Sequence, residues 1–420
     1  MKIHITSLGC RLNQSEIESV STLLLEQGHT ITSEYNADIY IINSCAVTQR
    51  SERKTRHLIN RARQALSGGP GGRIIVAGCA TEAITSEKGI IHIPNDYKYL
   101  IPEIIADRLN PLDMESCEPS RFNYATPLRS STNRVNLKIQ DGCDNFCSYC
   151  IIPFMRGAPR SKPAHRVMEE FRELVENGYK EIILTGVTIG KYQHEGVRLH
   201  GLVENILTIP GQYRVHMTSM APDMVTPELI SQLKSDRAVR HLHLSLQSGS
   251  DSVLGRMNRK YSRSQYLELT QQIRQEIPDF NFTTDLIVGF PGETEKDFMD
   301  SLDLIRQVGF SHIHTFRFTP RPGTAAAGMD GAVEEIEKTR RSSEVISLCM
   351  ELKREFYARF HKRDSLFLSE RSRNGTTSGF NEYYVPIDVE ESLPRNEFYK
   401  VTTRLDQGNH RLSGKVIEKQ

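Results

Sequence analysis

The stretch KIQDGCDNFCSYCIIPFMRG, residues 138–157, places three cysteines within eight positions, directly after a short run of alternating apolar residues. Cys143, Cys147 and Cys150 form a CxxxCxxC pattern with no second CxxC or HxxxH pair after it. A structural zinc site takes four N or S ligands, and a [4Fe-4S] cluster also normally takes four thiolates. Three thiolates would leave one iron open to a small molecule. Zinc with a distant fourth ligand, or incidental cysteines, remain alternatives.

The chain around this stretch alternates between strand-like and helical patterns. Helical periodicity is strongest over residues 164–178, 262–276 and 293–308. Six β/α units predict a barrel or part of one, and such barrels place their chemistry at the carboxyl ends of the strands. The cysteine stretch follows the first of these strands and is expected at that rim. The six strand-like runs are RVNLKIQDG, EIILTGV, RVHMTSM, HLHLSLQSG, NFTTDLIVGFPG and HIHTFRFTPRPG.

The first eighty residues repeat a unit of strand, turn and cysteine. The runs IHITSLGC, DIYIINSC and RIIVAGC end at Cys10, Cys45 and Cys79, and helical stretches follow the first two. Strands alternating with helices predict a parallel sheet, in which ligands collect at the carboxyl ends of the strands. We therefore expect these three cysteines to converge on one edge. The alternative is three small buried thiols.

The fold class predicted for the whole chain is α/β with three parts. We expect an N-terminal parallel α/β domain over residues 1–115, a partial (β/α)6 barrel over 133–355 and a small all-β module over 362–420. Residues 111–132, where Pro and Ser accumulate, are predicted to be a linker. Cys117 in this linker and Cys349 in a helical pattern are interpreted as structural.

Composition limits the possible partners. With 420 residues and a formal net charge of +1, the chain has no overall field that would recruit nucleic acid or a membrane surface. No signal peptide and no apolar run of about 20 residues is present, so we expect a soluble, cytoplasmic protein without a membrane partner. In that reducing compartment the eight cysteines are more readily metal ligands, nucleophiles or buried thiols than disulfides.

A local basic patch is the candidate for RNA contact. The helical stretch QRSERKTRHLINRAR, residues 49–63, carries six cations against one acid just after Cys45. Such a helix suits a phosphate backbone, although a charge run is often only a solvated helix face. The residues predicted to contact RNA are Arg50, Arg53, Lys54 and Arg56, with Arg156 and Arg160 after the central cysteines.

The motifs together resemble one known family. CxxxCxxC after the first barrel strand resembles the radical S-adenosylmethionine superfamily. With SLGCRLNQSE, NSCAVTQRSERKTR, AGC, LTGVTIG, HLHLSLQSGSDSVLGRMNRKY, TTDLIVGFPGETEKDF and PRPGTAAA, essentially the whole chain resembles the methylthiotransferases. LGCRLNQSE and NSCAVT resemble the branch acting on N6-threonylcarbamoyladenosine in tRNA. The resemblance implies that the C-terminal module is of the TRAM type.

The resemblance also implies cofactors, partners and a reaction. Cys143, Cys147 and Cys150 match the ligands of a radical-generating [4Fe-4S] cluster, and Cys10, Cys45 and Cys79 match those of an auxiliary one. One S-adenosylmethionine would methylate a sulfur on the auxiliary cluster, and a second would yield the radical that takes hydrogen from C2 of the adenine. Transfer of a methylthio group to that carbon then requires tRNA, an electron donor such as flavodoxin or ferredoxin, and a sulfur source.

Further residues at strand ends are candidates for binding the cofactor. Tyr149 could pack against S-adenosylmethionine or shield the cluster from water. Gly186 ends the second strand, where the superfamily contacts the cofactor and where glycine permits close backbone approach. Polar groups after two other strands are candidates for contacts to ribose, nucleoside or substrate. The predicted cofactor-binding residues are Tyr149, Gly186, Ser245, Gln247, Asp285 and Gly289.

Three alternative functions stay open at this point. Two are enzymatic: methylthiolation of a ribosomal protein, or of isopentenyladenosine in tRNA. The third belongs to another class, a non-catalytic metal-binding RNA module that would hold zinc. The barrel with polar strand ends argues against this third function, because simple binding does not need it.

Overall fold

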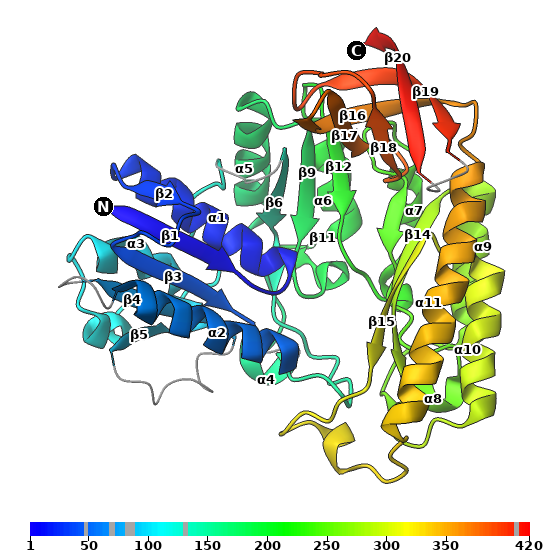
Figure 1. Cartoon of the computed structure of the whole chain (residues 1–420), viewed down its shortest axis with the longest axis horizontal. Helices are drawn as coiled ribbons and strands as arrows, with labels where there is room; N and C mark the ends of the chain where they lie inside the picture. The colour runs from blue at the N-terminus through cyan, green and yellow to red at the C-terminus, as the bar shows by residue number, and fades with distance from the viewer. Residues whose placement is uncertain (46–48, 67–71, 80–88, 129–132, 407–410) are drawn as a thin grey trace.

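Figure 1 shows the computed structural model, which describes residues 1–45, 49–66, 72–79, 89–128, 133–406 and 411–420. An N-terminal sheet with its helices lies beside a larger array of strands and helices, and a small β-barrel sits at one end of that array. Separate hydrophobic cores fill the three parts. No described helix is both long enough and apolar enough to cross a bilayer.

The N-terminal part is a five-stranded parallel sheet in the order β2-β1-β3-β4-β5. Its central strand β3 (Ile39–Ser44) is buried at every position, as expected for a strand covered on both faces. The predicted strands before the three cysteines are confirmed as β1 (Lys2–Ser7), β3 and β4 (Arg73–Gly78). The remaining elements are β2 (Thr30–Thr32), β5 (Ile90–Ile93), α1 (Arg11–Glu26), α2 (Gln49–Leu66), η2 (Asn95–Leu100), α3 (Ile101–Ile105) and η3 (Pro111–Ser116).

All six strands predicted for the partial barrel are present and parallel. They form two ladders, β12-β9-β6 and β13-β14-β15, which the bridges Val215–Ala238 and Met220–Leu244 connect. The strand bounds are β6 (Arg134–Lys138), β9 (Glu181–Thr185), β12 (Arg214–Met217), β13 (His241–His243), β14 (Asn281–Val288) and β15 (His312–Arg317). The prediction of a partial (β/α)6 barrel is therefore confirmed.

Helices cover the outside of these strands. The longest is α11 (Glu335–Ala358), which packs beside β15. The other helices are α4 (Ile152–Arg156), α5 (Ala164–Glu176), α6 (Leu199–Leu207), α7 (Pro227–Leu233), α8 (Asp251–Arg256), α9 (Arg263–Glu276) and α10 (Glu295–Val308). Short pieces complete this part: β7 (Gln140–Asp141), β8 (Arg160–Ser161), β10 (Gln193–His194), β11 (Val197–Arg198), η4 (Ile189–Lys191), η5 (Pro222–Met224) and η6 (Ala325–Gly328).

The strand β14 shows why polar side chains line the inside of the barrel. Burial alternates along it, so that Phe282, Leu286 and Val288 join the core under the helices. Thr283 and Asp285 are only half-buried and point to the opposite, inner face, because successive residues of a strand point to opposite sides. The inner face of the barrel is therefore polar and partly open.

The C-terminal part is a closed barrel of five strands in the order β16-β17-β18-β20-β19. It covers the amino-terminal ends of the larger barrel's strands, where Asn281 Nδ2 donates to the Tyr383 carbonyl (2.8 Å) and the Arg240 amide donates to the Glu382 carbonyl (2.8 Å). The predicted all-β tail is thus confirmed. Its strands are β16 (Asp364–Arg373), β17 (Thr376–Phe380), β18 (Pro386–Val389), β19 (Phe398–Leu405) and β20 (Leu412–Lys419).

Candidate functional site

The first set of cysteines lies at the carboxyl ends of three neighbouring strands. Cys10, Cys45 and Cys79 follow β1, β3 and β4, which are adjacent in the sheet. The register pairs Ser44 with Gly78, so Cys45 and Cys79 directly follow paired residues. Cys10 is exposed at the start of α1, whereas the other two are buried, and all three are outside disulfides. The predicted placement of these cysteines at one sheet edge is confirmed.

Asn13 and Gly9 hold the loops of this set together. Asn13 Nδ2 donates to the carbonyls of Leu8 (3.0 Å) and Ser44 (2.9 Å), which precede the first two cysteines. Gly9 has a φ of +97°, and a Cβ added there would lie 2.8 Å from the Sγ of Cys45. Glycine at this position is required both by the backbone conformation and by the close approach of the thiol.

The second set of cysteines, Cys143, Cys147 and Cys150, occupies a loop that backbone hydrogen bonds hold in place. The Cys143 amide donates to the Gly157 carbonyl (2.9 Å), and the Cys150 amide donates to the Cys147 carbonyl (2.9 Å). Burial raises the pKa of Cys150 to about 12, so its thiol gives up a proton only when a strong cationic group such as a metal binds it.

Arg259 supplies a positive charge to this loop. Its Nη1 donates to the Sγ of Cys147 (3.2 Å), and its buried Nη2 has no hydrogen-bond partner among the described residues. A guanidinium beside a cysteine stabilises the thiolate form, which is the form that ligates metals. Both sets offer three thiols each, held by donors and close backbone contacts, so the donor chemistry fits an iron-sulfur cluster with one iron left open.

A buried network of charges lies between the two sets. Glu16 of α1 accepts from Lys98 Nζ (2.6 Å) and Lys138 Nζ (2.6 Å). Arg156 Nη1 binds Asp141 Oδ2 (2.9 Å) and Glu16 Oε1 (3.1 Å). All five side chains are at most 4% exposed. The network joins the N-terminal sheet to the barrel.

The charges in this network suppress protonation of its acids. Burial alone would raise the pKa of Glu16, but Arg156, Lys138 and Lys98 outweigh it and hold that pKa well below its usual range. Burial opposes ionisation of Asp141 in the same way, and Arg156 and Lys138 nevertheless lower its pKa to about 2. Both carboxylates are therefore ionised at neutral pH.

The predicted RNA contact of Arg156 is wrong. Its side chain is 2% exposed, and both acids of the network bind its guanidinium, so a phosphate cannot reach it. By contrast, the four residues of α2 that were predicted to contact RNA are exposed, and so is Arg160 on β8; their contact with RNA stays a prediction. The exposed residues of α2 in this set are Arg50, Arg53, Lys54 and Arg56.

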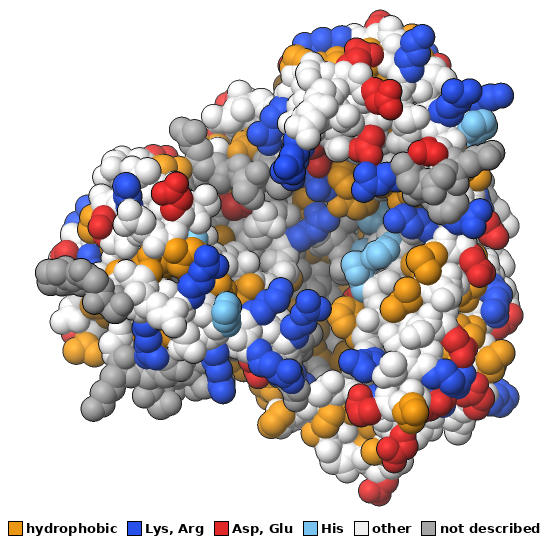
Figure 2. Space-filling model, in the orientation of Figure 1, with side chains coloured by type: hydrophobic (Ala, Val, Ile, Leu, Met, Phe, Trp, Pro, Cys, Tyr) orange, Lys and Arg blue, Asp and Glu red, His pale blue; other side chains and the backbone are white. Residues whose placement is uncertain are grey.

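Glu52, the one acid on this part of α2, already forms an ion pair within the protein. Arg321, in the loop after β15, donates from Nη1 to Glu52 Oε1 (2.7 Å), which ties the basic helix to the barrel. Figure 2 shows Lys and Arg side chains gathered over this face of the N-terminal part, beside a hollow that also contains histidine side chains. The basic surface therefore borders the hollow between the parts of the molecule.

The predicted cofactor residues are four residues with functional side chains, Tyr149, Ser245, Gln247 and Asp285, and two glycines, Gly186 and Gly289. Tyr149 is half-buried with its ring edge-on to Phe290 (centroids 6.5 Å apart), a contact that fits either cofactor packing or shielding. Ser245 is half-buried and lies two residues after the end of β13. Gln247 has a φ of +64°, and its amide donates to the Asp285 carbonyl (2.8 Å). These roles stay predictions.

The close contacts of the two glycines involve other protein groups. A Cβ on Gly186 would lie 2.8 Å from the Gln140 carbonyl oxygen, and one on Gly289 would lie 2.3 Å from Lys338 Cγ. Both positions therefore need glycine for internal packing, which explains them without a cofactor.

Asp285, the remaining predicted cofactor residue, has a partner within the protein. Its carboxylate pairs with His243 (3.2 Å).

Sequence reasoning missed three residues of the site. Glu16, Lys138 and Arg259 lie inside the motifs that carried the family resemblance, yet nothing in their spacing indicated a partner. Their roles depend on contacts across 82 to 140 positions, such as Arg259 with Cys147 at a separation of 112 residues. Glu16 and Lys138 could have been marked by their position close to a cysteine in the sequence, whereas Arg259 has no cysteine near it in the sequence.

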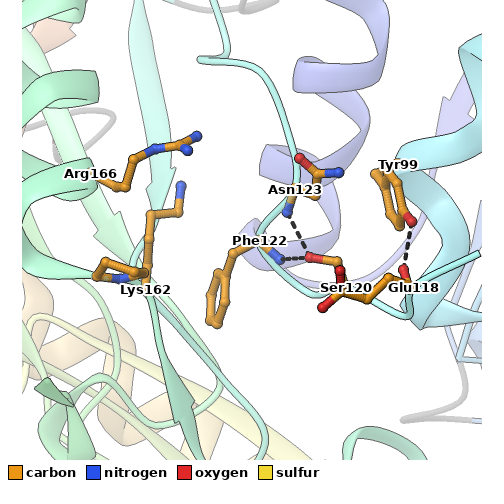
Figure 3. Close-up of a pocket in the computed structure, with 8 residues that line it drawn as sticks. Tyr99, Glu118, Ser120, Phe122, Asn123, Lys162 and Arg166 are labelled. Carbon is orange, nitrogen blue, oxygen red and sulfur yellow. Dashed lines mark hydrogen bonds between the residues drawn. The ribbon is translucent and has the colours of Figure 1, made fainter.

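A separate pocket of about 360 Å³ lies between the segment after η3 and the start of α5 (Figure 3). Arg166 and Lys162 lie on one side of it and Tyr99 on the other. Lys162 is bound to Glu170 (2.6 Å) and is nearly buried. None of the predicted site residues lines this pocket. The lining residues are Tyr99, Glu118, Ser120, Phe122, Asn123, Lys162, Pro163 and Arg166.

Comparison with known proteins identifies the family. Residues 137–305 match the Radical SAM superfamily model, and residues 2–97 match the model described as Uncharacterized protein family UPF0004. The chain is 39% identical over 395 residues to the Threonylcarbamoyladenosine tRNA methylthiotransferase MtaB of Thermotoga maritima, covering 91% of this chain and 90% of the relative. The chain belongs to the radical S-adenosylmethionine methylthiotransferase family.

Further matches agree with this membership. A tRNA-2-methylthio-N(6)-dimethylallyladenosine synthase of a Thermoanaerobacter species (strain X514) is 33% identical, covering 90% of this chain and 86% of that one. The radical S-adenosylmethionine methyltransferase TsrM of Kitasatospora setae has a TM-score of 0.57 at 11% identity, covering 78% of this chain and 77% of its own, which shows a shared fold. This methylthiotransferase is thus an enzyme of the radical S-adenosylmethionine type, a class that uses that cofactor and a [4Fe-4S] cluster.

Proposed function

We propose that this methylthiotransferase adds a methylthio group to C2 of N6-threonylcarbamoyladenosine next to the anticodon of tRNA. The observation that carries the proposal is the first set of three thiols at one sheet edge, linked through Asn13 and Arg156 to the loop of the second set. The 39% identical relative bears the name of this activity.

The residues that would hold the cofactors are the six cysteines. Cys143, Cys147 and Cys150 would ligate the radical-generating cluster, and Cys10, Cys45 and Cys79 an auxiliary cluster. When bound, the clusters and S-adenosylmethionine supply an electron, an organic radical, the sulfur and the methyl group. The protein's own part is to orient and protect: Arg259 holds its positive charge beside the Cys147 sulfur, and Tyr149 with Phe290 limits water beside the loop.

The tRNA would bind along the basic surface of α2. Six exposed cations lie on this helix, among them the four predicted to contact RNA, and the exposed Arg160 follows the central cysteines. Contacts to phosphates position a nucleic acid without reading its sequence, so the selected adenosine must be recognised in the hollow beside the helix. An electron donor such as flavodoxin or ferredoxin, a sulfur source and a cytoplasmic location complete the proposal.

A second candidate function is methylthiolation of isopentenyladenosine in tRNA. The observation in its favour is the match to dimethylallyladenosine synthases at 33% identity. Higher identity to the threonylcarbamoyladenosine enzyme favours the first candidate.

Nucleoside mass spectrometry separates these functions. The gene would be expressed in a host that lacks its own methylthiotransferase genes, and digested tRNA would be analysed for both 2-methylthio nucleosides. We expect only the threonylcarbamoyl product. Unmodified tRNA from a host with soluble, iron-loaded protein would refute the proposal, and the isopentenyl product alone would support the second candidate.

Two cysteine variants test whether the two sets of cysteines have different roles in the reaction. Cys147→Ala should abolish cleavage of S-adenosylmethionine to 5′-deoxyadenosine in anaerobically reconstituted protein. Cys45→Ala should retain that cleavage but give no methylthio product. Equal loss of cleavage in both variants would contradict the assigned roles.

A further inference from the structure

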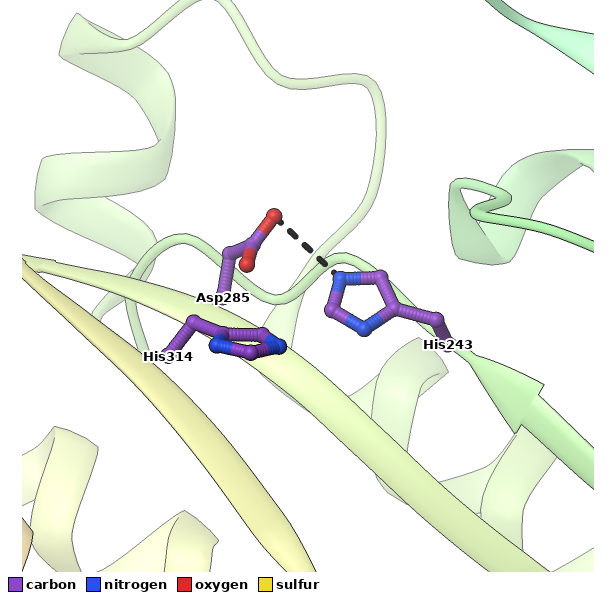
Figure 4. Close-up of side chains that lie close together, drawn as sticks. All are labelled: His243, Asp285 and His314. Carbon is purple, nitrogen blue, oxygen red and sulfur yellow. Dashed lines mark ion pairs between the residues drawn. The ribbon is translucent and has the colours of Figure 1, made fainter. Parts of the chain in front are cut away.

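Three side chains from adjacent barrel strands meet at the inner face of the barrel. His243 of β13, Asp285 of β14 and His314 of β15 each offer one ligand atom, and these atoms all lie within 4.8 Å of one another. His243 Nε2 is 3.2 Å from Asp285 Oδ2, and the strand register places Asp285 opposite His314. Figure 4 shows the three side chains pointing toward one another. None of the six cysteines belongs to this group.

A chain of hydrogen bonds fixes the ring of His243. Its Nδ1 is bonded to Thr283 Oγ1 (3.1 Å), which leaves Nε2 turned toward Asp285. Thr283 Oγ1 is also bonded to His241 Nε2 (2.9 Å), and His241 Nδ1 is bonded to His216 Nε2 (2.8 Å). Metal-binding histidines typically have the second ring nitrogen held in this way by an outer group, which sets the ring orientation.

The third member of the group lacks such a partner. The His314 ring has no hydrogen bond to any of the described residues, and its side chain is exposed. His243 and Asp285 are half-buried. If the group served only as an internal ion pair, His243 and Asp285 would satisfy each other and His314 would add nothing.

The charge of the group favours a cation over an anion. The carboxylate of Asp285 brings a negative charge, and an imidazole that ligates a metal ion does so through an unprotonated ring nitrogen. Two histidines and one carboxylate form a donor set that divalent transition metals bind, with further coordination positions left open. His314 is exposed, so an ion can reach the group from solvent.

We propose that His243, Asp285 and His314 form a binding site for a divalent transition-metal ion of the Zn²⁺ class, distinct from the cysteine sites. The open positions of the ion face the hollow. This assigns the Asp285 carboxylate to a metal rather than to the S-adenosylmethionine contact predicted from the sequence.

The test is a Zn²⁺ titration of the anaerobically purified, cluster-loaded full chain without RNA or S-adenosylmethionine. Zinc and iron are measured together by mass spectrometry after free ions are removed. We expect one zinc ion per wild-type chain at full iron loading. His314→Ala and Asp285→Asn should lose this ion with unchanged iron, and Thr283→Val should weaken its binding about tenfold through the outer contact.

His312→Ala is the matched control, because His312 is an exposed histidine on the same strand and is not part of the group. It should bind zinc as the wild type does. The proposal is overturned if the wild type takes up no zinc, or if His314→Ala and Asp285→Asn retain as much zinc as the wild type. Because methylthio transfer is not measured, failure here leaves the proposed function standing, and failure of that function leaves this site standing.

Discussion

Arg156 Nη2 donates a hydrogen bond of 2.6 Å to Asn13 Oδ1, and this bond connects the two sets of cysteines. Arg156 lies on α4, six residues after Cys150, while Asn13 binds the carbonyls that precede Cys10 and Cys45. One buried guanidinium therefore sets how the two cysteine loops lie relative to each other.

Replacing Arg156 should destabilise the protein strongly. Arg156→Leu leaves Glu16 and Asp141 with less compensation inside the protein, and breaking a buried ion pair in this way costs about 3–5 kcal/mol. Thermal unfolding monitored by circular dichroism measures this effect. Arg160→Leu is the control, since an exposed arginine changes stability by at most about 0.5 kcal/mol. Equal melting temperatures for the two variants would contradict the prediction.

Gly9→Ala should remove iron from one set of cysteines only. The new Cβ would lie 2.8 Å from Cys45 Sγ, so the thiol must move away from its position. We expect the loss of about half the wild-type iron, as the proposal of two [4Fe-4S] clusters requires, with S-adenosylmethionine cleavage retained. Iron and sulfide analysis with electron paramagnetic resonance checks this.

Gly28→Ala separates backbone strain from the contact with the thiol. Gly28 also has a positive φ (+81°), but no atom of the described residues lies within 4 Å of its added Cβ. The Gly28 variant should keep full iron content. Iron loss of the same size in both variants would assign the effect to the backbone strain alone.

Neutralising the basic face of α2 should weaken binding of tRNA and make it less sensitive to salt. Each exposed cation that contacts a phosphate contributes about 1 to the magnitude of the negative slope of log affinity against log salt. The double variant Arg53→Gln with Arg56→Gln should therefore reduce the magnitude of this slope by about 2. Filter binding or fluorescence anisotropy at several salt concentrations measures the slope. Lys296→Gln on the distant helix α10 is the control, and an unchanged slope in the double variant would exclude α2 as the RNA surface.

Stability should fall as the pH drops below about 6.5, in part because of His216. Burial lowers the pKa of His216 to about 4, although the nearby Glu181 acts in the opposite direction. Since the unfolded chain binds this proton at higher pH than the folded one, stability rises with pH between about 4 and 6.5, by about 1.4 kcal/mol per unit for each such histidine. Besides His216 and Glu181, the groups around this site are His241, Arg11, Arg134 and Tyr384.

Urea unfolding at pH 5.5 and 7.0 tests this dependence. His216→Gln removes the titrating ring and should flatten the change in free energy of unfolding between the two pH values. His165→Gln, on the outside of α5, should leave the wild-type dependence intact. A wild-type stability that rises on acidification would refute the assignment.

The sequence predicted the backbone well because the relevant signals are local. The β-branched runs that end before Cys10, Cys45 and Cys79 identify parallel strands, and parallel strands that follow one another in sequence usually become neighbours in the sheet. The six barrel strands were predicted for the same reason. The short edge strands β2 and β5 were not, because three or four residues give too weak a periodic signal.

Side-chain environments could not be predicted in the same way. Arg156 was predicted to contact RNA because it follows the central cysteines, yet its partner Glu16 comes from a position 140 residues earlier. Nor did the sequence indicate the group of His243, Asp285 and His314. These residues come together only when three separate strands lie side by side, and no spacing rule relates them.

The junction of the three parts at Tyr384 has a consequence for biosynthesis. Arg11 and Arg134 donate to the Tyr384 hydroxyl (3.1 and 2.5 Å), so the first and second parts of the chain both depend on a residue near its end. While the ribosome is still making the last part, these guanidiniums and the amino-terminal ends of the barrel strands have no partner from the C-terminal barrel. A nascent chain therefore gains these two hydrogen bonds only after the segment with Tyr384 is made, whereas the bond from Arg156 to Asn13 can form earlier.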